Sequence, residues 1–313
     1  MKKLMTAALV AACFASSAWA GALPDEINMV YVKSPFNLQN MVIKEQGLLE
    51  KEFAKDNVKI NWKTITSGAK QSQAMAAGSV DISAAMNTAS LLGANGAGNP
   101  VLVANGVAHP ADIFAIVGQK GEKLTIKDLK GKKVAGPRGT VLHQLLVASL
   151  VKNGMTADDV EFLSMGIPEA MSAVTSGRVT AALLPASAMI KATEAGCQVI
   201  TTAKDVVDVN LVMTVRKAFA DEHPEALARV VKVQRESLKW INDNWKEAVT
   251  LGAKEHGISY EDADKLARWS NYYDVLTVKD VNGLAADQEF LLANDLMKKA
   301  VDVKSLVLPS AMK

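Results

Sequence analysis

Short apolar stretches alternate with segments of helical periodicity along most of the chain. The alternation between strand-like and helix-like segments favours a mainly parallel sheet covered by helices on both faces, so the fold class predicted is α/β. Strands are predicted at 27–32, 58–66, 81–86, 100–107, 112–119, 133–136, 160–166, 179–185, 197–203 and 210–215. Helices are predicted at 37–56, 70–77, 88–98, 140–154, 168–177 and 186–196, with two long helices within 223–257.

The pattern restarts after about residue 112, which indicates two α/β units followed by a helical C-terminal third. Because this last third has no strands of its own, we expect it to pack back on the first unit. The predicted division is a first lobe formed by 21–114 and 209–313 and a second lobe formed by 115–208. The strands near 112–118 and 208–214 would then cross between the lobes at a hinge.

The first twenty residues have the pattern of an export signal. "MKK" is a basic start, "LMTAALVAACFA" is an apolar core, and "AWA" ends at Ala20 with the small residues of a cleavage site. The stretch "VAAC" offers an alternative, in which Cys13 carries a lipid anchor. We expect residues 1–20 to be a signal peptide and the protein to be periplasmic.

Composition argues against nucleic acid as a partner. The chain has 35 basic and 33 acidic residues, and removal of Lys2 and Lys3 with the leader leaves 33 of each. A chain without net charge offers no general attraction for a polyanion. Beyond the leader Cys197 is the only cysteine, so no internal disulfide is possible, and we expect a partly buried side chain. No two histidines have the spacing of metal ligands, and we expect no metal or other cofactor.

Two stretches, 67–90 and 170–188, share one rhythm of helix, glycine, strand and a second helix opened by small residues. Such junctions meet at the carboxyl edge of a parallel sheet, where α/β proteins bind ligands. Helix N-termini there present free N–H groups, so we expect recognition by backbone amides and hydroxyls. For Gly78 and Gly177 close helix–sheet packing is the preferred interpretation. For the hydroxyl and amide residues at helix starts, plain N-capping is an equally good one.

Several longer stretches resemble the periplasmic substrate-binding proteins of ABC importers, in particular the group serving taurine, alkanesulfonates, nitrate and thiamine-precursor pyrimidines. They are "GLLEKEF", "AMAAGSVDIS", "DLKGKKVAGPRGTVLHQLL", "PEAMSAVTSGRVTAAL" and "KAFADEHPEALARVVKVQRESLKWINDNWKEAV". The resemblance covers nearly the whole chain after the leader. It implies two lobes that close on a small molecule, docking to an inner-membrane permease, and action as a monomer.

The resemblance also implies which loops contact the ligand. Two departures from the family pattern stand out: Thr180 occupies a position that is often acidic, and the loop at Pro185 lacks an aromatic or acidic residue. An ammonium group on the ligand therefore lacks its obvious partner, although Glu169 could supply one. The predicted ligand-binding residues are Ser34, Phe36, Asn37, Ser67, Gly68, Asn87, Thr88, Arg138, Gly139, Thr140, Ile167, Pro185 and Ser187.

Helix N-termini together with Arg138 favour an anionic ligand, although Arg138 as an ordinary surface charge is an equal alternative. Met86, Met165 and Met189 could form an apolar wall. The expected ligand is a small organic anion, a sulfonate or a carboxylate. The alternatives are a neutral or aromatic precursor such as a pyrimidine, and a periplasmic sensor rather than a transport component.

Catalysis has less support in the sequence. "SGAK" at 67–70 matches the Ser-x-x-Lys pattern of penicillin-recognising enzymes, but "SLVK" at 149–152 matches it equally well. The accompanying Ser-Asp-Asn and Lys-Thr-Gly motifs are missing from the sequence. A periplasmic serine hydrolase is therefore the least favoured alternative, and we expect a binding protein rather than an enzyme.

Overall fold

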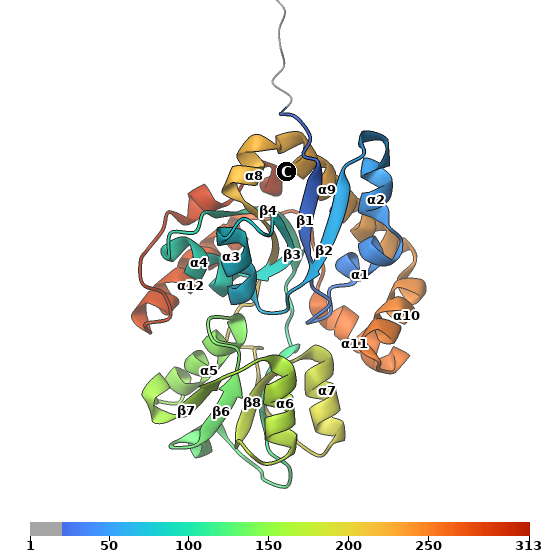
Figure 1. Ribbon diagram of the computed structural model, residues 1–313. Coiled ribbons are helices and arrows are strands. Elements are labelled where there is room, and N and C mark those ends of the chain that lie inside the picture. Colours follow the sequence, from blue (N-terminus) through green and yellow to red (C-terminus); the bar gives the residue numbers. More distant parts are fainter. Residues whose placement is uncertain (1–20) are drawn as a thin grey trace, which may run out of the picture.

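Two five-stranded sheets form the framework of the protein, as seen in a computed structural model that describes residues 21–313. The predicted leader and Cys13 lie outside the described residues. The first sheet has the order β2-β1-β3-β10-β4 and the second the order β7-β6-β8-β5-β9. Figure 1 shows the two sheets one above the other, each with helices packed around it.

In each sheet four strands run in one direction and one strand is reversed, which fits the predicted mainly parallel arrangement. The reversed strands are β10 in the first sheet and β5 in the second. The strands are β1 Glu26–Tyr31, β2 Lys59–Thr64, β3 Ile82–Asn87, β4 Val101–Ala108, β5 Phe114–Gly118, β6 Lys133–Gly136, β7 Glu161–Ser164, β8 Ala181–Pro185, β9 Gln198–Thr202 and β10 Leu211–Arg216.

Helices cover both sheets. The α-helices are α1 Leu38–Glu45, α2 Leu48–Phe53, α3 Gly68–Ala76, α4 Thr88–Gly96, α5 Val141–Lys152, α6 Ile167–Thr175, α7 Ala186–Glu194, α8 Lys217–Glu222, α9 Pro224–Asp243, α10 Trp245–His256, α11 Tyr260–Ser270 and α12 Val278–Ala293. Short 3₁₀ helices lie at Ala54–Asp56, Ile126–Leu129, Ala157–Asp159, Val303–Leu306 and Pro309–Met312.

The chain passes between the sheets twice, from β4 to β5 and from β9 back to β10. We call the first sheet with its helices the first lobe, and the second sheet with α5, α6 and α7 the second lobe. Strands β4, β5 and β8 are buried along their whole length, which explains why Asn105 in β4 is the one polar side chain among them. The residue boundaries predicted for the two lobes stay a prediction.

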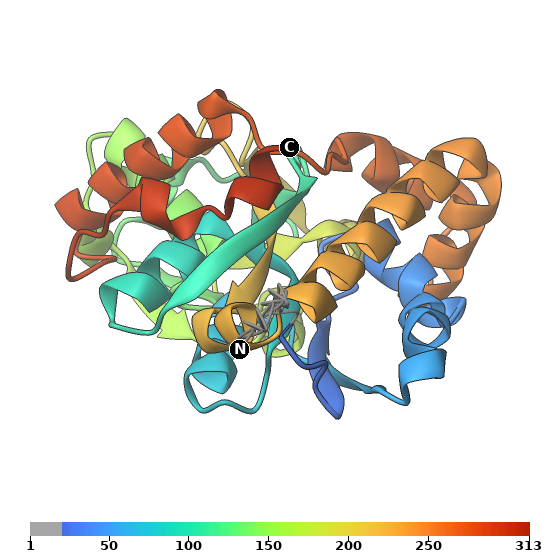
Figure 2. The same cartoon turned by 90° about the horizontal axis from the view of Figure 1, so that it is seen from above.

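The helical C-terminal third packs on the first lobe, as predicted. Helix α9 lies against α1 and α2, and α12 lies against α4. Seen from above in Figure 2, the orange helices of this third flank one side of the first sheet and the red helix flanks the other. The backbone N–H of Leu308 donates to the carbonyl of Val103 at 3.0 Å, so the last residues are tied to β4.

Three sequence interpretations need correction. The helix predicted over 37–56 is two helices, because Gly47 adopts a left-handed conformation (φ +59°) between α1 and α2. Gly78 and Gly177 do not serve close packing. Both have left-handed φ angles just after a helix, and a Cβ would meet nothing closer than 3.9 Å at either position. They end α3 and α6 as glycines commonly end helices.

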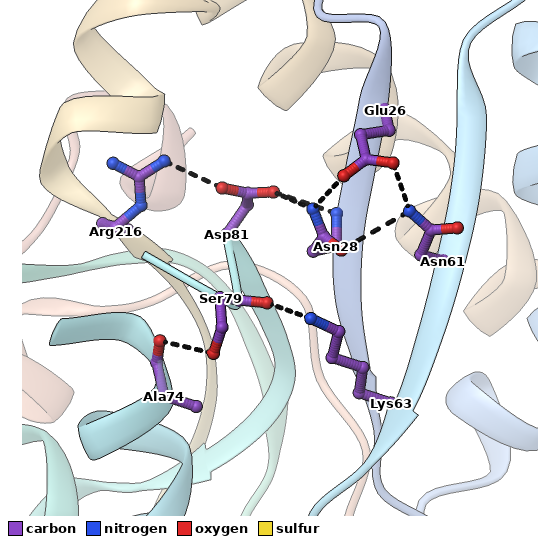
Figure 3. A network of polar contacts seen from close by, with 8 residues as sticks. All are labelled: Glu26, Asn28, Asn61, Lys63, Ala74, Ser79, Asp81 and Arg216. Atoms are coloured by element: carbon purple, nitrogen blue, oxygen red, sulfur yellow. Dashed lines mark hydrogen bonds and ion pairs between the residues drawn. The ribbon is translucent and has the colours of Figure 1, made fainter. Parts of the chain in front are cut away.

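A polar network closes the amino ends of the strands in the first sheet (Figure 3). Asp81 accepts hydrogen bonds from the backbone N–H of Asn28 at 2.9 Å and from Arg216 at 2.8 Å. Glu26 accepts from the Asn61 amide at 2.8 Å. The ion pair of Asp81 with Arg216 and these hydrogen bonds lie at the amino edge of the sheet, opposite the edge where its parallel strands end.

Across residues 21–313, none of the helices has the length and apolar character required to cross a bilayer.

Candidate ligand-binding site

A cavity of about 520 Å³ lies between the two lobes. Its walls combine residues that follow strands of the first sheet with residues that follow strands of the second, so both carboxyl edges face it. This volume falls within the range of about 300–1,000 Å³ that is usual for small-molecule sites. The lining includes Val32, Ser34, Asn37, Ser67, Gly68, Lys70, Met86, Asn87, Phe114, Arg138, Thr140, Ser164, Met165, Ile167, Pro185 and Leu211.

The N-cap residues of six helices line the cavity. Each precedes the first turn of its helix, where backbone N–H groups have no partner within the helix and the helix dipole is positive. Six such ends at one cavity supply its wall with hydrogen-bond donors, although the N–H groups of Thr88, Val141 and Ala186 already donate to Asn210, Asn87 and Ile113. The six residues are Asn37 (α1), Ser67 (α3), Asn87 (α4), Thr140 (α5), Gly166 (α6) and Pro185 (α7).

Asn87 connects the two lobes at this wall. Its side-chain oxygen Oδ1 accepts a hydrogen bond from the N–H of Ser90 at 2.9 Å, which caps α4, and another from the N–H of Val141 at 3.2 Å, in α5 of the second lobe. Next to it, the hydroxyl of Ser90 donates to the carbonyl of Gly139 at 3.0 Å. One amide side chain therefore shares its oxygen between helix starts from both lobes.

The charged side chains in the wall are both cations. Lys70 belongs to the first turn of α3 and Arg138 to the loop between β6 and α5, and both are exposed. Within residues 21–313, neither makes an ion pair. Among the described residues that line the cavity there is no Asp or Glu. The cavity therefore carries a positive potential that nothing in its wall neutralises.

Glu169, the suggested partner for a ligand ammonium, does not line this cavity. Its carboxylate is turned toward the start of its own helix, since a Cβ at Gly166 would lie 2.4 Å from Oε2 of Glu169. A carboxylate in the first turn of a helix is stabilised there by the dipole.

The structure brings most of the predicted site residues together at the cavity. Whether they bind ligand stays a prediction. Position 68 needs a glycine, because a Cβ there would lie 2.5 Å from the hydroxyl of Ser90. The predicted residues that line the cavity are Ser34, Asn37, Ser67, Gly68, Asn87, Arg138, Thr140, Ile167 and Pro185.

Four predicted residues lie outside the cavity lining, and two of them pack around His256. The ring of Phe36 is fully buried, with its centroid 4.9 Å from that of the His256 imidazole. The hydroxyl of Ser187, at the start of α7, lies 2.8 Å from Nδ1 of His256 in α10. The Ser187 contact joins the second lobe to the C-terminal helices, on the side of the molecule away from α4 and α5 (Figure 1).

The other two residues outside the lining make contacts of a different kind. The hydroxyl of Thr88 donates to Asp287 at 2.8 Å, and Gln144 of the second lobe donates to the same carboxylate at 2.7 Å. Burial raises the pKa of Asp287, while these two hydrogen bonds act in the opposite direction. Gly139 has a left-handed φ of +71° and accepts from Ser90.

Sequence reasoning missed Lys70, Phe114 and Leu211 as wall residues. Lys70 follows Ser67 by three residues, within the first turn of α3, so the helix start already identified could have pointed to it. Phe114 and Leu211 begin the two reversed strands, which enter their sheets beside the cavity. Of the three methionines considered, Met86 and Met165 reach the cavity, whereas Met189 packs in the core of the second lobe.

The histidines near the cleft are engaged by neighbours. His109 stacks on Tyr273 and lies 3.1 Å from Asp280. His143 is buried against Phe162, and burial followed by the charge of Arg138 lowers its pKa to about 4. In the described part of the chain, no cluster of His, Cys, Asp and Glu has the arrangement of a metal site. Cys197 is buried, which raises the pKa of its thiol.

The geometry is that of a two-lobed solute-binding protein, and comparison with known proteins agrees with it. Residues 50–248, more than half of the chain, match the family model described as "NMT1/THI5 like". The chain belongs to this family.

The relatives that the chain matches have names that describe binding, and two of them illustrate this. The "Putative aliphatic sulfonates-binding protein" of Bacillus subtilis (strain 168) is 25% identical over 281 residues, which is 85% of this chain and 81% of the relative. The "Taurine-binding periplasmic protein" of Escherichia coli (strain K12) is 29% identical over 194 residues, 58% of this chain and 57% of the relative.

Solved structures confirm the fold. The alkanesulfonate-binding protein SsuA from Xanthomonas axonopodis pv. citri, bound to MOPS, superposes with a TM-score of 0.82 at 20% identity, covering 92% of this chain and 99% of SsuA. The desulfurization enzyme DSZB has the same fold, with a TM-score of 0.68 at 14% identity over 92% of this chain and 97% of the enzyme. The fold therefore serves both binding proteins and at least one enzyme.

Proposed function

We propose that this protein is the solute-binding component of an ABC import system, and that it captures a small organic anion between its two lobes. The anion is a sulfonate or a carboxylate with a modest apolar part. The mature protein acts in the periplasm as a monomer and delivers its ligand to an inner-membrane permease. Relatives named for binding sulfonates and taurine support this assignment.

The observation that carries the proposal is the convergence of six helix starts on one cavity together with Lys70 and Arg138. Free backbone N–H groups and uncompensated cations both favour an anion, and the absence of carboxylates from the described wall leaves nothing to oppose it. Met86, Met165 and Ile167 provide an apolar surface for the rest of the ligand.

The residues that line the cavity give less support to two alternative functions. A pyrimidine would be favoured by several aromatic rings, and Phe114 is the one aromatic side chain in the described lining. A hydrolytic role would use Ser67 with Lys70, which stand in the Ser-x-x-Lys pattern, and the fold is shared with an enzyme. Six sets of N–H donors around a cavity of this size fit reversible capture better than covalent chemistry.

A thermal-shift screen of purified residues 21–313 tests the proposal. The ligands are alkanesulfonates, carboxylates, nitrate and pyrimidines, with nitrocefin and a simple ester as probes of turnover. A bound ligand at a hundredfold excess over its dissociation constant stabilises the protein by about 2.7 kcal/mol. We expect stabilisation by organic anions. Stabilisation by uncharged compounds alone, or turnover of either probe, would contradict the proposal.

A further inference from the structure

Arg138 is held by an aromatic ring rather than by a carboxylate. Its guanidinium carbon lies 4.8 Å from the centroid of the Phe162 ring, a distance typical of a cation–π contact. Phe162 belongs to β7, the edge strand next to β6, and Arg138 lies two residues after the end of β6. Because an aromatic ring holds a guanidinium without neutralising it, Arg138 keeps its full charge at the cavity wall.

The other two arginines that stack on rings show how unusual this is. Arg229 stacks on Phe53 at 4.3 Å but also pairs with Glu52 and Asp56. Arg268 lies over Trp245 and pairs with Asp264. Within residues 21–313, the Arg138 side chain has neither an ion pair nor a hydrogen bond, so the Phe162 ring is the one partner of its guanidinium there.

A side chain of α5 holds the ring of Phe162 in place. The imidazole of His143 stacks on it with centroids 4.5 Å apart and an angle of 25° between the planes. His143 is only 6% exposed. Its lowered pKa keeps it uncharged at neutral pH, so it supports the ring without repelling the guanidinium.

We propose that Phe162, stacked on His143, is a positioning residue that holds the guanidinium of Arg138 ready to receive the anionic group of the ligand. The ring fixes a long, mobile side chain in advance and so reduces the entropy lost on binding. Phe162 itself contacts no ligand atom. This inference rests on the proposed function, because it needs an anion that Arg138 receives.

A double-mutant cycle tests the inference, with butanesulfonate as the probe and calorimetric affinities for the wild type, Phe162→Leu, Arg138→Gln and the double variant. We expect Phe162→Leu to weaken binding about 3- to 10-fold and Phe162→Tyr, which keeps a ring, to change it less than twofold. In the Arg138→Gln background, Phe162→Leu should change the affinity less than twofold. If Phe162→Leu does not fold, Phe162→Met takes its place in the cycle.

A matched control is Phe53→Leu, which removes the ring beneath Arg229 far from the cavity and should leave the affinity unchanged. The positioning role would be overturned if Phe162→Leu lowered the affinity for butanesulfonate equally in the wild-type and Arg138→Gln backgrounds. It would also be overturned if Phe162→Leu alone kept the wild-type affinity. In either case a clear loss in Arg138→Gln would leave the proposed function standing. A wild type without affinity for butanesulfonate or any other organic anion would overturn both.

Discussion

The side-chain oxygen of Asn87 lies 3.2 Å from the backbone nitrogen of Val141, so an amide of the first lobe accepts a hydrogen bond from the first turn of a helix in the second. The same oxygen caps α4 through the N–H of Ser90. Because Asn87 also lines the cavity, the contact that joins the lobes is part of the wall that would meet a ligand. We therefore expect Asn87 to couple closure of the two lobes to recognition of the ligand.

Replacing Asn87 by Asp adds one negative charge at this point with almost no change in shape. The carboxylate can accept the same two hydrogen bonds, and two helix dipoles favour it, so we expect the melting temperature to be retained or raised. Affinity for an organic anion should fall about 10- to 100-fold through charge repulsion across the cavity. Calorimetric titration with butanesulfonate measures this, and unchanged affinity in Asn87→Asp would contradict an anionic ligand.

Lys70 and Arg138 should both contribute to anion affinity. A hydrogen bond to a charged group contributes about 1.5–3 kcal/mol, so Lys70→Gln and Arg138→Gln should each weaken binding about 10- to 100-fold. Each should also reduce the dependence of affinity on salt concentration. Lys51→Gln, on the exposed surface of α2, is the control and should behave as the wild type. If the affinity of both cavity variants depended on salt concentration as steeply as that of the wild type, direct contact of Lys70 and Arg138 with the anion would be contradicted.

The cavity should discriminate against a ligand that carries an ammonium group. Since no carboxylate occurs among the described lining residues, we expect taurine to bind at least tenfold more weakly than isethionate, which has a hydroxyl in place of the amine. Gln73→Glu places a carboxylate on the wall and should narrow this difference. Competition titrations compare the two ligands, and a preference of the wild type for taurine would show that a carboxylate reaches the ligand after all.

Stability should depend on pH through His256. Its Nε2 lies 3.1 Å from the carbonyl of Lys33, which can only accept, so Nε2 carries the proton and Nδ1 accepts from Ser187. Burial, together with the charges of Lys33 and Lys191, lowers its pKa from 6.5 to about 4. The unfolded chain therefore binds more protons between these values, and the stabilisation present above pH 6.5 is lost as the pH falls toward 4.

His256→Gln keeps a donor and an acceptor but does not titrate. Relative to this variant, the wild type should lose up to about 3 kcal/mol more free energy of unfolding between pH 7.5 and pH 4. His143 has a similarly lowered pKa, so part of the decline should persist in the variant. Urea unfolding at a series of pH values gives the comparison, and equal slopes in the two proteins would contradict a neutral, buried His256.

The sequence pattern predicts the cavity wall at the junctions between a strand and the helix that follows it. Ser67, Asn87 and Thr140 were found in this way, because the carboxyl ends of parallel strands meet at one edge. Phe36 and Ser187 show the limit of this reasoning. Phe36 lies in the expected loop and Ser187 in the first turn of α7, but both side chains turn to His256, which is far along the chain. These two side chains face away from the cavity because α10 packs beside them in the completed fold, which the local sequence does not show.

The partners of charged side chains are also hard to predict from the sequence, because they come from segments that meet only in the completed fold. Arg138 was identified from its place at a helix start, but the ring beneath it comes from β7, which adjoins β6 only once the second sheet has formed. The sequence alone leaves Glu169 available to a ligand, whereas in the structure its carboxylate lies against Gly166.

The most direct test is a crystal structure of residues 21–313 with a bound alkanesulfonate. The account predicts a sulfonate group between the lobes, within hydrogen-bond distance of backbone N–H groups at the starts of α3, α4 or α5 and of the Arg138 guanidinium. A ligand bound away from these helix starts, or one held mainly by side chains outside the cavity, would contradict it.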